Sequence, residues 1–511
     1  MKRRRIRLGI IIAILAAAAM VIAACSEAGG TGGLPDEGAP DGGSSSSDGG
    51  PTGLAPYELT LYYPGTPQKD ERLVEEAINQ ILIPKINATL NIIPIEWGAW
   101  NDRMNLMIAA REKADIIFTA QWNGYVSHVG KGAFREVSDL LQKHGQGILE
   151  TLDPIFLEGA KINGKIYGVP TNKEFAAAGG VVYDKKIAEE LGLDMRSVKT
   201  PQDLTPILEK VKQARPDITP VWTNGGLFNS HYFGNYDFLG DVTIPGAILK
   251  DRDDTTVRPV EELERYREYL AIAREWYKRG FINQDATTTQ ESSIDVWKAR
   301  STFLTIESLK PGKAEEIASS AGRSGELDQI IMTPKTISTS ETAGAMLAIS
   351  STSDDPERAM MFINLLHTDK ELNNLLNFGI EGVHYTRKGE IISPTERTPD
   401  YSPGSAWMFG NQFLNYIWDS EDPEKWRKFR EFNQNAHISP GLGFIFDSDP
   451  VKSEVGALAN VIEQYQRALE TGAVDPNKVL PEYLGAMRAA GLDKIIAEKQ
   501  RQFDAFLAGR T

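Results

Sequence analysis

The chain has 511 residues, of which 70 are acidic and 55 are basic, so its formal net charge at pH 7 is −15. Such an acidic protein is repelled by phosphate backbones and anionic head groups, which argues against nucleic acid as a partner. Its single cysteine excludes an internal disulfide and a metal site built from several cysteines.

Residues 1–24 have the layout of a secretory signal peptide. Five basic residues at positions 2–7 precede an uncharged apolar run, and their removal takes the net charge from −15 to −20. The run ends Ile22-Ala23-Ala24-Cys25, which resembles the lipobox of bacterial lipoproteins, in which the cysteine thiol takes a diacylglyceryl group. We therefore predict a lipid anchor at Cys25, where two acyl chains give stable attachment. The alternatives are a plain cleaved signal and an uncleaved helix near the minimum spanning length of about 17 residues.

Residues 25–56 contain mainly Gly, Ser, Pro and Asp after the cysteine, with almost no side chain that can bury apolar surface. This composition predicts a disordered linker. A Gly/Ser-rich coil of this length has an r.m.s. span of about 30 Å, so the body that follows can turn freely above a membrane.

The body begins with alternating strand and helix patterns. Tyr57–Tyr63 alternates as a strand and stops at Pro64-Gly65, and an amphipathic helix follows with Leu73, Ile78, Ile81 and Leu82 on one side. A strand at 90–97, a helix near 102–111 and a strand at 115–118 continue this order. The order predicts a parallel sheet covered by helices, in which ligands bind beyond the carboxyl ends of the strands.

About 455 residues follow the linker, which is too many for one core, so we expect two α/β lobes. Asn163-Gly164 predicts a tight hairpin turn. The remaining patterns predict strands at 166–169, 180–184, 218–222, 303–306 and 345–349, and helices at 201–214, at 260–279 and after a cap near 353–356. From Gly404 onward the pattern is mostly helical.

Several stretches are similar to a known family. Gly164 to Pro170 (GKIYGVP) and Val182 to Lys185 (VYDK) resemble the GKxYGxP and YNKxL signatures of family 1 extracellular solute-binding proteins. These are the receptors of sugar ABC importers and are related to maltose-binding protein. The stretches GIEGVHY at 379–385, WMFGNQ at 407–412 and the closing AGLDKIIAEKQRQ resemble a subfamily with an extra C-terminal domain.

This resemblance implies two lobes joined by hinge strands, with solute bound in the cleft and closure by hinge rotation. On this sequence it implies a first lobe at 57–172 plus 341–387, and a second lobe at 173–340 plus 388–511 with a helical C-terminal region. It also implies an oligosaccharide ligand, the transmembrane subunits of an ABC permease as partners, and a monomer held at the outer face of a cytoplasmic membrane, of the Gram-positive type.

A sugar site needs flat aromatic rings and side chains that bond hydroxyl groups. Trp122 and Asn123 follow one strand end, Trp222 and Asn224 follow another, and Trp97 flanks a third. For each aromatic residue, the alternative role is packing in the core.

Further candidates come from the crossing segments and the C-terminal region. Trp407 and Asn411 are spaced to share one face of a helix. Glu174 on the first predicted crossing and Glu307 after the strand at 303–306 are candidate hydroxyl acceptors, although either could be a surface carboxylate. A further set of basic residues near the crossings would suit an acidic sugar, namely Lys173, Arg387 and Lys388.

Searches for catalytic chemistry find little. GAKINGK at 159–165 imitates a phosphate loop, but Ile166 replaces the required Ser or Thr, and neither an HExxH nor a G-x-S-x-G motif is present. The acidic turns at 251–254 and 447–449 lack a calcium-loop pattern. We therefore predict no catalytic residues, no metal and no cofactor. Two alternatives stay open: the same fold binding a peptide or another non-sugar solute, and, more remotely, a surface glycoside hydrolase that uses paired carboxylates.

Overall fold

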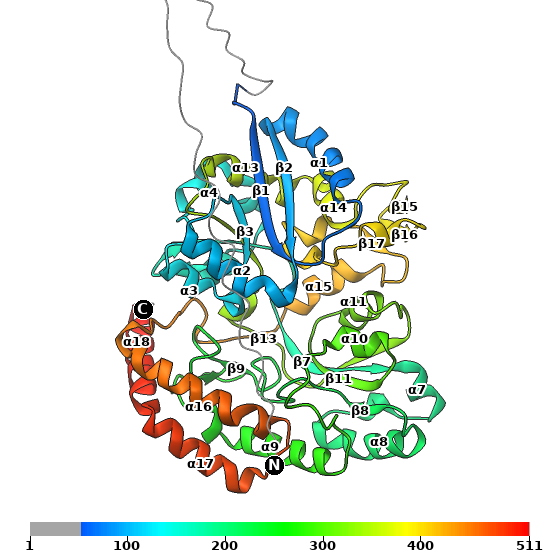
Figure 1. Ribbon diagram of the computed structural model, residues 1–511, viewed down its shortest axis with the longest axis vertical. Coiled ribbons are helices and arrows are strands. Elements are labelled where there is room, and N and C mark those ends of the chain that lie inside the picture. The colour runs from blue at the N-terminus through cyan, green and yellow to red at the C-terminus, as the bar shows by residue number, and fades with distance from the viewer. Residues whose placement is uncertain (1–52, 510–511) are drawn as a thin grey trace, which may run out of the picture. The chain divides into compact units, whose positions relative to one another are not determined.

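The computed structural model describes residues 53–509, so the predicted signal peptide, Cys25 and all but the end of the predicted linker lie outside the described residues. Within 53–509, no helix is both long enough and apolar enough to cross a membrane. These residues form two α/β lobes and a helical C-terminal region (Figure 1). The predicted fold class is therefore confirmed.

The sheet of the first lobe has the strand order β2-β1-β3-β14-β6. Its strands are β1 (Tyr57–Pro64), β2 (Ala88–Ile95), β3 (Ile116–Thr119), β6 (Val169–Pro170) and β14 (Met346–Ile349). β1 pairs in parallel with β2 and β3, as predicted, so the carboxyl ends of these three strands meet at one edge. β14 runs antiparallel to β3 and β6 because the chain returns here from the second lobe.

Helices cover the first sheet. They are α1 (Glu71–Ile86), α2 (Trp97–Ala110), α3 (Tyr125–Gly130), α4 (Ser138–His144), α5 (Gln146–Thr151), α6 (Pro154–Gly159), α13 (Pro356–Thr368) and α14 (Lys370–Phe378). In α1 the buried residues follow every fourth position, at Val74, Ile78, Leu82 and Ile86. Leu73, predicted to face the core, is instead 36% exposed because the buried stripe runs through its neighbour.

The sheet of the second lobe has the order β12-β7-β11-β8. It is formed by β7 (Ala178–Asp184), β8 (Thr219–Val221), β11 (Thr302–Leu309) and β12 (Leu327–Ile331), and its helices are α7 (Lys185–Glu190), α8 (Pro201–Ala214), α9 (Glu264–Lys278), α10 (Ser293–Lys298) and α11 (Lys313–Ser320). β7 is antiparallel to both of its neighbours, whereas β8 is parallel to β11. The helix predicted at 260–279 is divided, because a 3₁₀ turn at 260–262 and an extended Leu263 precede α9.

The turn at Asn163-Gly164 joins β4 (Lys161–Ile162) to β5 (Lys165–Ile166) in an antiparallel hairpin, as predicted. Both turn residues have positive φ, 51° and 77°, which Asn and Gly adopt most readily. The sequence that imitates a phosphate loop is therefore a hairpin, with no helix N-terminus following it.

The C-terminal helices form a separate apolar core with part of the second lobe. α16 (Lys452–Glu470), α17 (Pro476–Ala489) and α18 (Leu492–Ala508) pack with α9 and with the hairpin of β9 (Tyr236–Asp237) and β10 (Ile248–Leu249). Leu270, Tyr483 and Phe503 are fully buried in this core. In Figure 1 these helices are the orange and red elements beside α9.

The expected assignment of residues 388–511 to the second lobe needs correction. Tyr401, Met408 and Phe409 belong to the core of the first lobe, and the Tyr401 hydroxyl donates to the carbonyl of Leu376 at 2.8 Å. Nearby lie a small sheet of β15 (Tyr385–Lys388), β16 (Ile391–Pro394) and β17 (Ile417–Trp418), and the helix α15 (Lys425–Asn433). The first lobe therefore extends through these residues beyond position 387.

Three segments connect the first lobe to the second lobe and the C-terminal helices. The first runs from β6 through Asn172 to β7, and Asn172 pairs in parallel with Asn411. The second returns from β12 through β13 (Thr336–Ile337) and the short helix α12 (Thr339–Thr342) to β14. The third follows α15 through β18 (His437–Ile438), which pairs in parallel with β13.

Candidate ligand-binding site

Three tryptophans predicted as ligand contacts gather at the carboxyl edge of the first sheet. Trp97 opens α2 after β2, Trp122 lies in the 3₁₀ turn after β3, and Trp407 comes from the C-terminal part of the chain. The Trp97 ring lies 6.3 Å from Trp122 and 6.4 Å from Trp407, with interplanar angles of 24° and 11°. The Trp122 and Trp407 centroids are 6.3 Å apart. We call these residues the tryptophan cluster.

The cluster rests on two buried aromatic residues. Phe118 of β3 contacts Trp407 edge-on at 5.7 Å and Trp122 at 6.3 Å. Trp100 packs on Phe118 from α2 and is only 1% exposed. Phe118 lies one residue before the end of β3, whose four residues are all buried, so its place at the end of an apolar strand was the available signal.

Hydrogen bonds orient the Trp122 indole and the side-chain amide of its neighbour Asn123. The Trp122 indole N–H donates to the carbonyl of Gly344 at 2.8 Å, and the Trp100 indole N–H donates to Asn123 Oδ1 at 2.8 Å. The buried Trp100 therefore holds the Asn123 amide in a fixed orientation beside the exposed Trp122 ring. Glu96, which precedes Trp97 and was not singled out, is exposed and accepts a hydrogen bond from Thr66 at 3.2 Å.

The exposure of the cluster is unusual for this chain. Trp97 is 47% exposed and Trp122 is 38% exposed, whereas Trp276 and Trp297 are fully buried. Trp407 is partly buried. Adjacent exposed aromatic rings at the edge of a sheet indicate a binding surface, because soluble proteins rarely leave such apolar area in water.

The predicted residues of the second lobe have a different environment. Trp222 is only 7% exposed, which favours the packing role over ligand contact. Asn224 is exposed and donates to the carbonyl of Glu291 at 3.1 Å, and Glu307 accepts from the Thr305 hydroxyl at 2.8 Å. Burial raises the pKa of Glu307 above its ordinary value.

Glu174 and Asn411 are engaged by the protein itself. Glu174 is 6% exposed and lies 2.9 Å from the Lys173 ammonium and 3.4 Å from Lys310. Although burial acts to raise its pKa, these two cations hold the pKa of Glu174 below its ordinary value. Asn411 is 6% exposed, donates to the His367 carbonyl and accepts from the Phe413 amide. Trp407 and Asn411 do not share a helix, because Trp407 lies in a 3₁₀ turn that ends at Met408.

The basic residues considered for an acidic sugar are mostly neutralised. Lys173 pairs with Glu174, and Arg387 pairs with Glu381 at 2.8 Å. Lys388 is an exposed residue of β15. None of the three contacts the tryptophan cluster through an interaction within residues 53–509.

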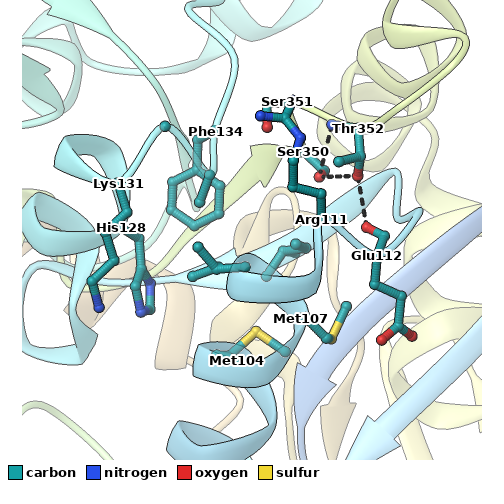
Figure 2. Close-up of a pocket in the computed structure, with 14 residues that line it drawn as sticks. Met104, Met107, Arg111, Glu112, His128, Lys131, Phe134, Ser350, Ser351 and Thr352 are labelled. Carbon is teal, nitrogen blue, oxygen red and sulfur yellow. Dashed lines mark hydrogen bonds between the residues drawn. The ribbon is translucent and has the colours of Figure 1, made fainter.

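Two cavities lie apart from the tryptophan cluster, and the second is lined in part by Asn411 and Lys173. One is a space of about 40 Å³ whose lining includes Met104, Met107, His128 and Phe134. Figure 2 shows these side chains and the hydrogen bonds that join Ser350, Thr352 and the Glu112 carbonyl in the same lining. This volume is too small for a sugar ring. An open groove of about 500 Å³ lies beside the first connecting segment. It is lined by residues that include Phe156, Phe175, Phe413 and Arg430.

Residues 53–509 contain no group of three or more His, Cys, Asp or Glu side chains placed to hold a metal ion. In the acidic turns at 251–254 and 447–449, carboxylates form ion pairs and hydrogen bonds with other groups of the protein. Asp251 pairs with Arg265 at 2.9 Å, Asp254 pairs with Arg258 at 2.6 Å, and Asp447 accepts from the Asp449 amide at 3.0 Å.

Two α/β lobes joined by three segments, with exposed aromatic rings at a strand-end edge, are the architecture of a two-lobe solute-binding protein. Residues 73–371 match the family model described as "Bacterial extracellular solute-binding protein", and the chain belongs to this family. Residues 440–508, which contain all three of the C-terminal helices α16, α17 and α18, match a second model, described as "Domain of unknown function (DUF3502)".

Known relatives agree with this assignment. The chain is 29% identical over 442 residues to a "Carbohydrate ABC transporter substrate-binding protein" of Streptococcus pneumoniae, covering 84% of this chain and 87% of that one. It also resembles the crystal structure of the N-glycan transport solute binding protein NgtS of Streptococcus pneumoniae, with a TM-score of 0.81 and 27% identity over 89% of this chain and all of that one. Against NgtS in complex with Man5GlcNAc the TM-score is 0.77, at the same identity and coverage.

Proposed function

We propose that this protein is a lipid-anchored receptor that captures an oligosaccharide between its lobes and delivers it to an ABC permease. The observation that carries the proposal is the tryptophan cluster, whose adjacent rings at a sheet edge match the repeated apolar faces of linked sugar rings. Asn123 and Glu96 stand beside these rings and supply a donor and an acceptor for hydroxyl groups. The carbohydrate and N-glycan named for the relatives support the same ligand class.

A neutral sugar fits better than a peptide or an acidic sugar. A peptide receptor needs charged groups for the two chain termini, and an acidic sugar needs an available cation. Of the three cations considered for that role, Lys173 and Arg387 are paired with Glu174 and Glu381, and Lys388 is an exposed residue of β15. We propose that the remaining candidates hold the binding site in place through contacts with the protein and do not contact the sugar directly. They are Trp222, Asn224, Glu307, Glu174 and Asn411.

The direct test uses the chain without residues 1–52. A panel of neutral oligosaccharides, including mannose and N-acetylglucosamine compounds, is titrated into the protein by calorimetry, with peptides and uronate oligomers as comparison ligands. We expect binding of at least one neutral oligosaccharide, no turnover of it during long incubation, and no binding of the peptides. Failure of every neutral sugar at millimolar concentration, or hydrolysis of one of them, contradicts the proposal.

The anchor is tested separately with the full chain. We propose that Cys25 carries the lipid and that the soluble body is a monomer. Cys25→Ala should prevent labelling with a clickable fatty acid and release the protein or leave its precursor uncleaved. The affinity of the body for sugar should not change. Fatty-acid labelling of the variant at the level of the native chain would show that the anchor lies elsewhere.

A further inference from the structure

The short helix α12 lies in the connecting segment that returns from the second sheet to the first. Ser338 and Glu341 form a capping box at its start, with Glu341 Oε2 accepting from the Ser338 amide at 2.8 Å and from its hydroxyl at 2.5 Å. Thr339, Ser340 and Thr342 are all buried. A four-residue helix held this firmly moves as one body with the residues that follow it.

On one side, α12 is joined to the turn that carries Trp122. The Gln121 amide donates to the Ala343 carbonyl at 2.9 Å, and the Ser340 hydroxyl donates to Gln121 Oε1 at 3.1 Å. The Trp122 indole donates to Gly344 at 2.8 Å. These three bonds mean that the orientation of the Trp122 ring depends on the position of α12 and of the residues just after it.

On the other side, α12 is joined to the second lobe by a buried ion pair. The Lys250 ammonium, one residue beyond β10, lies 2.5 Å from Glu341 Oε1, and the two side chains are 0% and 8% exposed. Although burial acts to raise its pKa, the Lys250 charge holds the pKa of Glu341 below its ordinary value, which favours the charged carboxylate. Removing one partner of such a pair leaves a buried charge without compensation and is strongly unfavourable.

We infer that Glu341 is a positioning residue for ligand capture, which ties the Trp122 ring through α12 to Lys250 of the second lobe. Movement of the second lobe then turns Trp122, and stacking of a sugar on Trp122 biases the position of the second lobe. The affinity part of this inference rests on the proposed function, whereas the coupling between Glu341 and the Trp122 ring does not.

The test compares Glu341→Gln with Asp184→Asn. Asp184 forms an ion pair of similar burial with Arg323, at 2.5 Å and with side chains 7% and 2% exposed, but both residues lie in the second lobe away from α12. The first readout is the indole N–H resonance of Trp122 in protein with ¹⁵N-labelled tryptophan, assigned by its absence in Trp122→Phe. The second is the dissociation constant for a sugar found in the titration panel.

We expect Glu341→Gln to shift the Trp122 indole resonance and to weaken sugar binding about tenfold, a typical coupling between two sites. Asp184→Asn should lower thermal stability as well, while the Trp122 resonance and the affinity stay as in the native protein. An unchanged Trp122 resonance in folded Glu341→Gln overturns the inference, as does an equal shift in Asp184→Asn.

A milder variant keeps the test decisive if Glu341→Gln does not fold. Ser340→Ala removes only the hydroxyl bonded to Gln121, and it should shift the same resonance with little loss of stability. An unchanged resonance in this variant also overturns the inference. If the native protein binds no sugar, the proposed function fails, while the indole spectra still decide whether α12 couples Glu341 to Trp122.

Discussion

The two lobes present the same short pattern at a strand end, but they use it differently. In the first lobe β3 ends at Thr119, and Trp122 follows after a turn, with its ring 38% exposed beside two other tryptophans. In the second lobe β8 ends at Val221, and Trp222 follows at once, with its ring only 7% exposed. A Trp at the end of a strand therefore indicates the edge of the sheet where ligands bind, but it does not indicate whether the ring is exposed to solvent.

The difference arises from the residues between the strand and the ring. Two residues separate Thr119 from Trp122. The 3₁₀ turn at Gln121–Asn123 places the Trp122 indole away from the core. Trp222 has no such turn, because its backbone amide still bonds to Leu304 of β11 and its side chain stays within the sheet layer. The comparison predicts a structural role for one tryptophan and a binding role for the other.

The largest expected effect is on the stability of the second lobe. Trp222→Ala removes a buried indole and should lower the free energy of unfolding by about 3–5 kcal/mol, as large-to-small core changes do. Trp122→Ala is the matched control and should lower it by less than about 1 kcal/mol, since its ring is partly in water. Chemical denaturation measures both values. A stable Trp222→Ala protein that had lost sugar binding would break the comparison.

The next effect is on binding through the first lobe. Trp122→Ala should weaken sugar binding by about 2–3 kcal/mol, or roughly 30- to 150-fold, because it removes one stacking surface and its apolar burial. Trp122→Phe keeps a ring but loses the bond to Gly344, so it should fall between the native protein and Trp122→Ala. Calorimetry gives the affinities, and equal affinities for all three proteins would remove Trp122 from the site.

The pH dependence of stability should also separate the two regions. Glu261 and Glu470 lie in the core shared by the second lobe and the C-terminal helices, 4% and 7% exposed, and accept from the hydroxyls of Tyr483 and Tyr266 at 3.5 and 3.1 Å. Burial raises the pKa of Glu261 to about 7, and burial likewise raises the pKa of Glu470 to about 7. The folded protein therefore favours their protonated form.

The sign of the effect follows from these values. The stabilisation is fully present below the ordinary carboxyl pKa of about 4.5 and is lost as pH rises through about 7, by on the order of 3 kcal/mol for each of the two carboxyls. Glu261→Gln should therefore stabilise the protein at pH 8 and flatten the dependence between pH 5 and 8 in thermal melts. Glu262→Gln, at a partly exposed residue paired with Arg488, is the control and should not flatten it. A native protein whose melting temperature rises from pH 5 to 8 contradicts this assignment.

All three tryptophans of the cluster were candidates, but local patterns were enough to predict only the framework and the positions of two of the rings. The parallel order of β1, β2 and β3 follows from their spacing with helices, and it places Trp97 and Trp122 at a shared edge. The third ring depends on contacts across the chain. Trp407 was assigned to a helix with Asn411, but its segment is held by Met408 and Phe409 in the core of the first lobe.

Some partners of the candidate residues could not be predicted, because they come from distant parts of the sequence. Glu174 is neutralised by Lys310, which is far along the chain, and Trp122 is oriented by a backbone carbonyl, Gly344, which leaves no residue-type signal. Gly410 carries the clearest local signal, with a φ of 57° and a missing Cβ that would lie 2.2 Å from the Leu366 carbonyl. This glycine allows a left-handed backbone conformation and a close approach to the Leu366 backbone, and both are incompatible with the predicted helix.

The smallest expected effect concerns the polar contribution of the second lobe. Glu307 is bonded to Thr305, and burial raises its pKa, so a neutral side chain of the same shape fits its surroundings. Glu307→Gln should therefore change sugar affinity by less than about threefold, which is under 1 kcal/mol. The matched change in the first lobe, Glu96→Gln, alters an exposed carboxylate beside Trp97 and should weaken binding more, because a charged acceptor forms the stronger hydrogen bond to a hydroxyl. If Glu307→Gln weakened binding more than Glu96→Gln, the second lobe would form the main hydrogen bonds to the sugar. The tryptophan cluster would then contribute only apolar stacking.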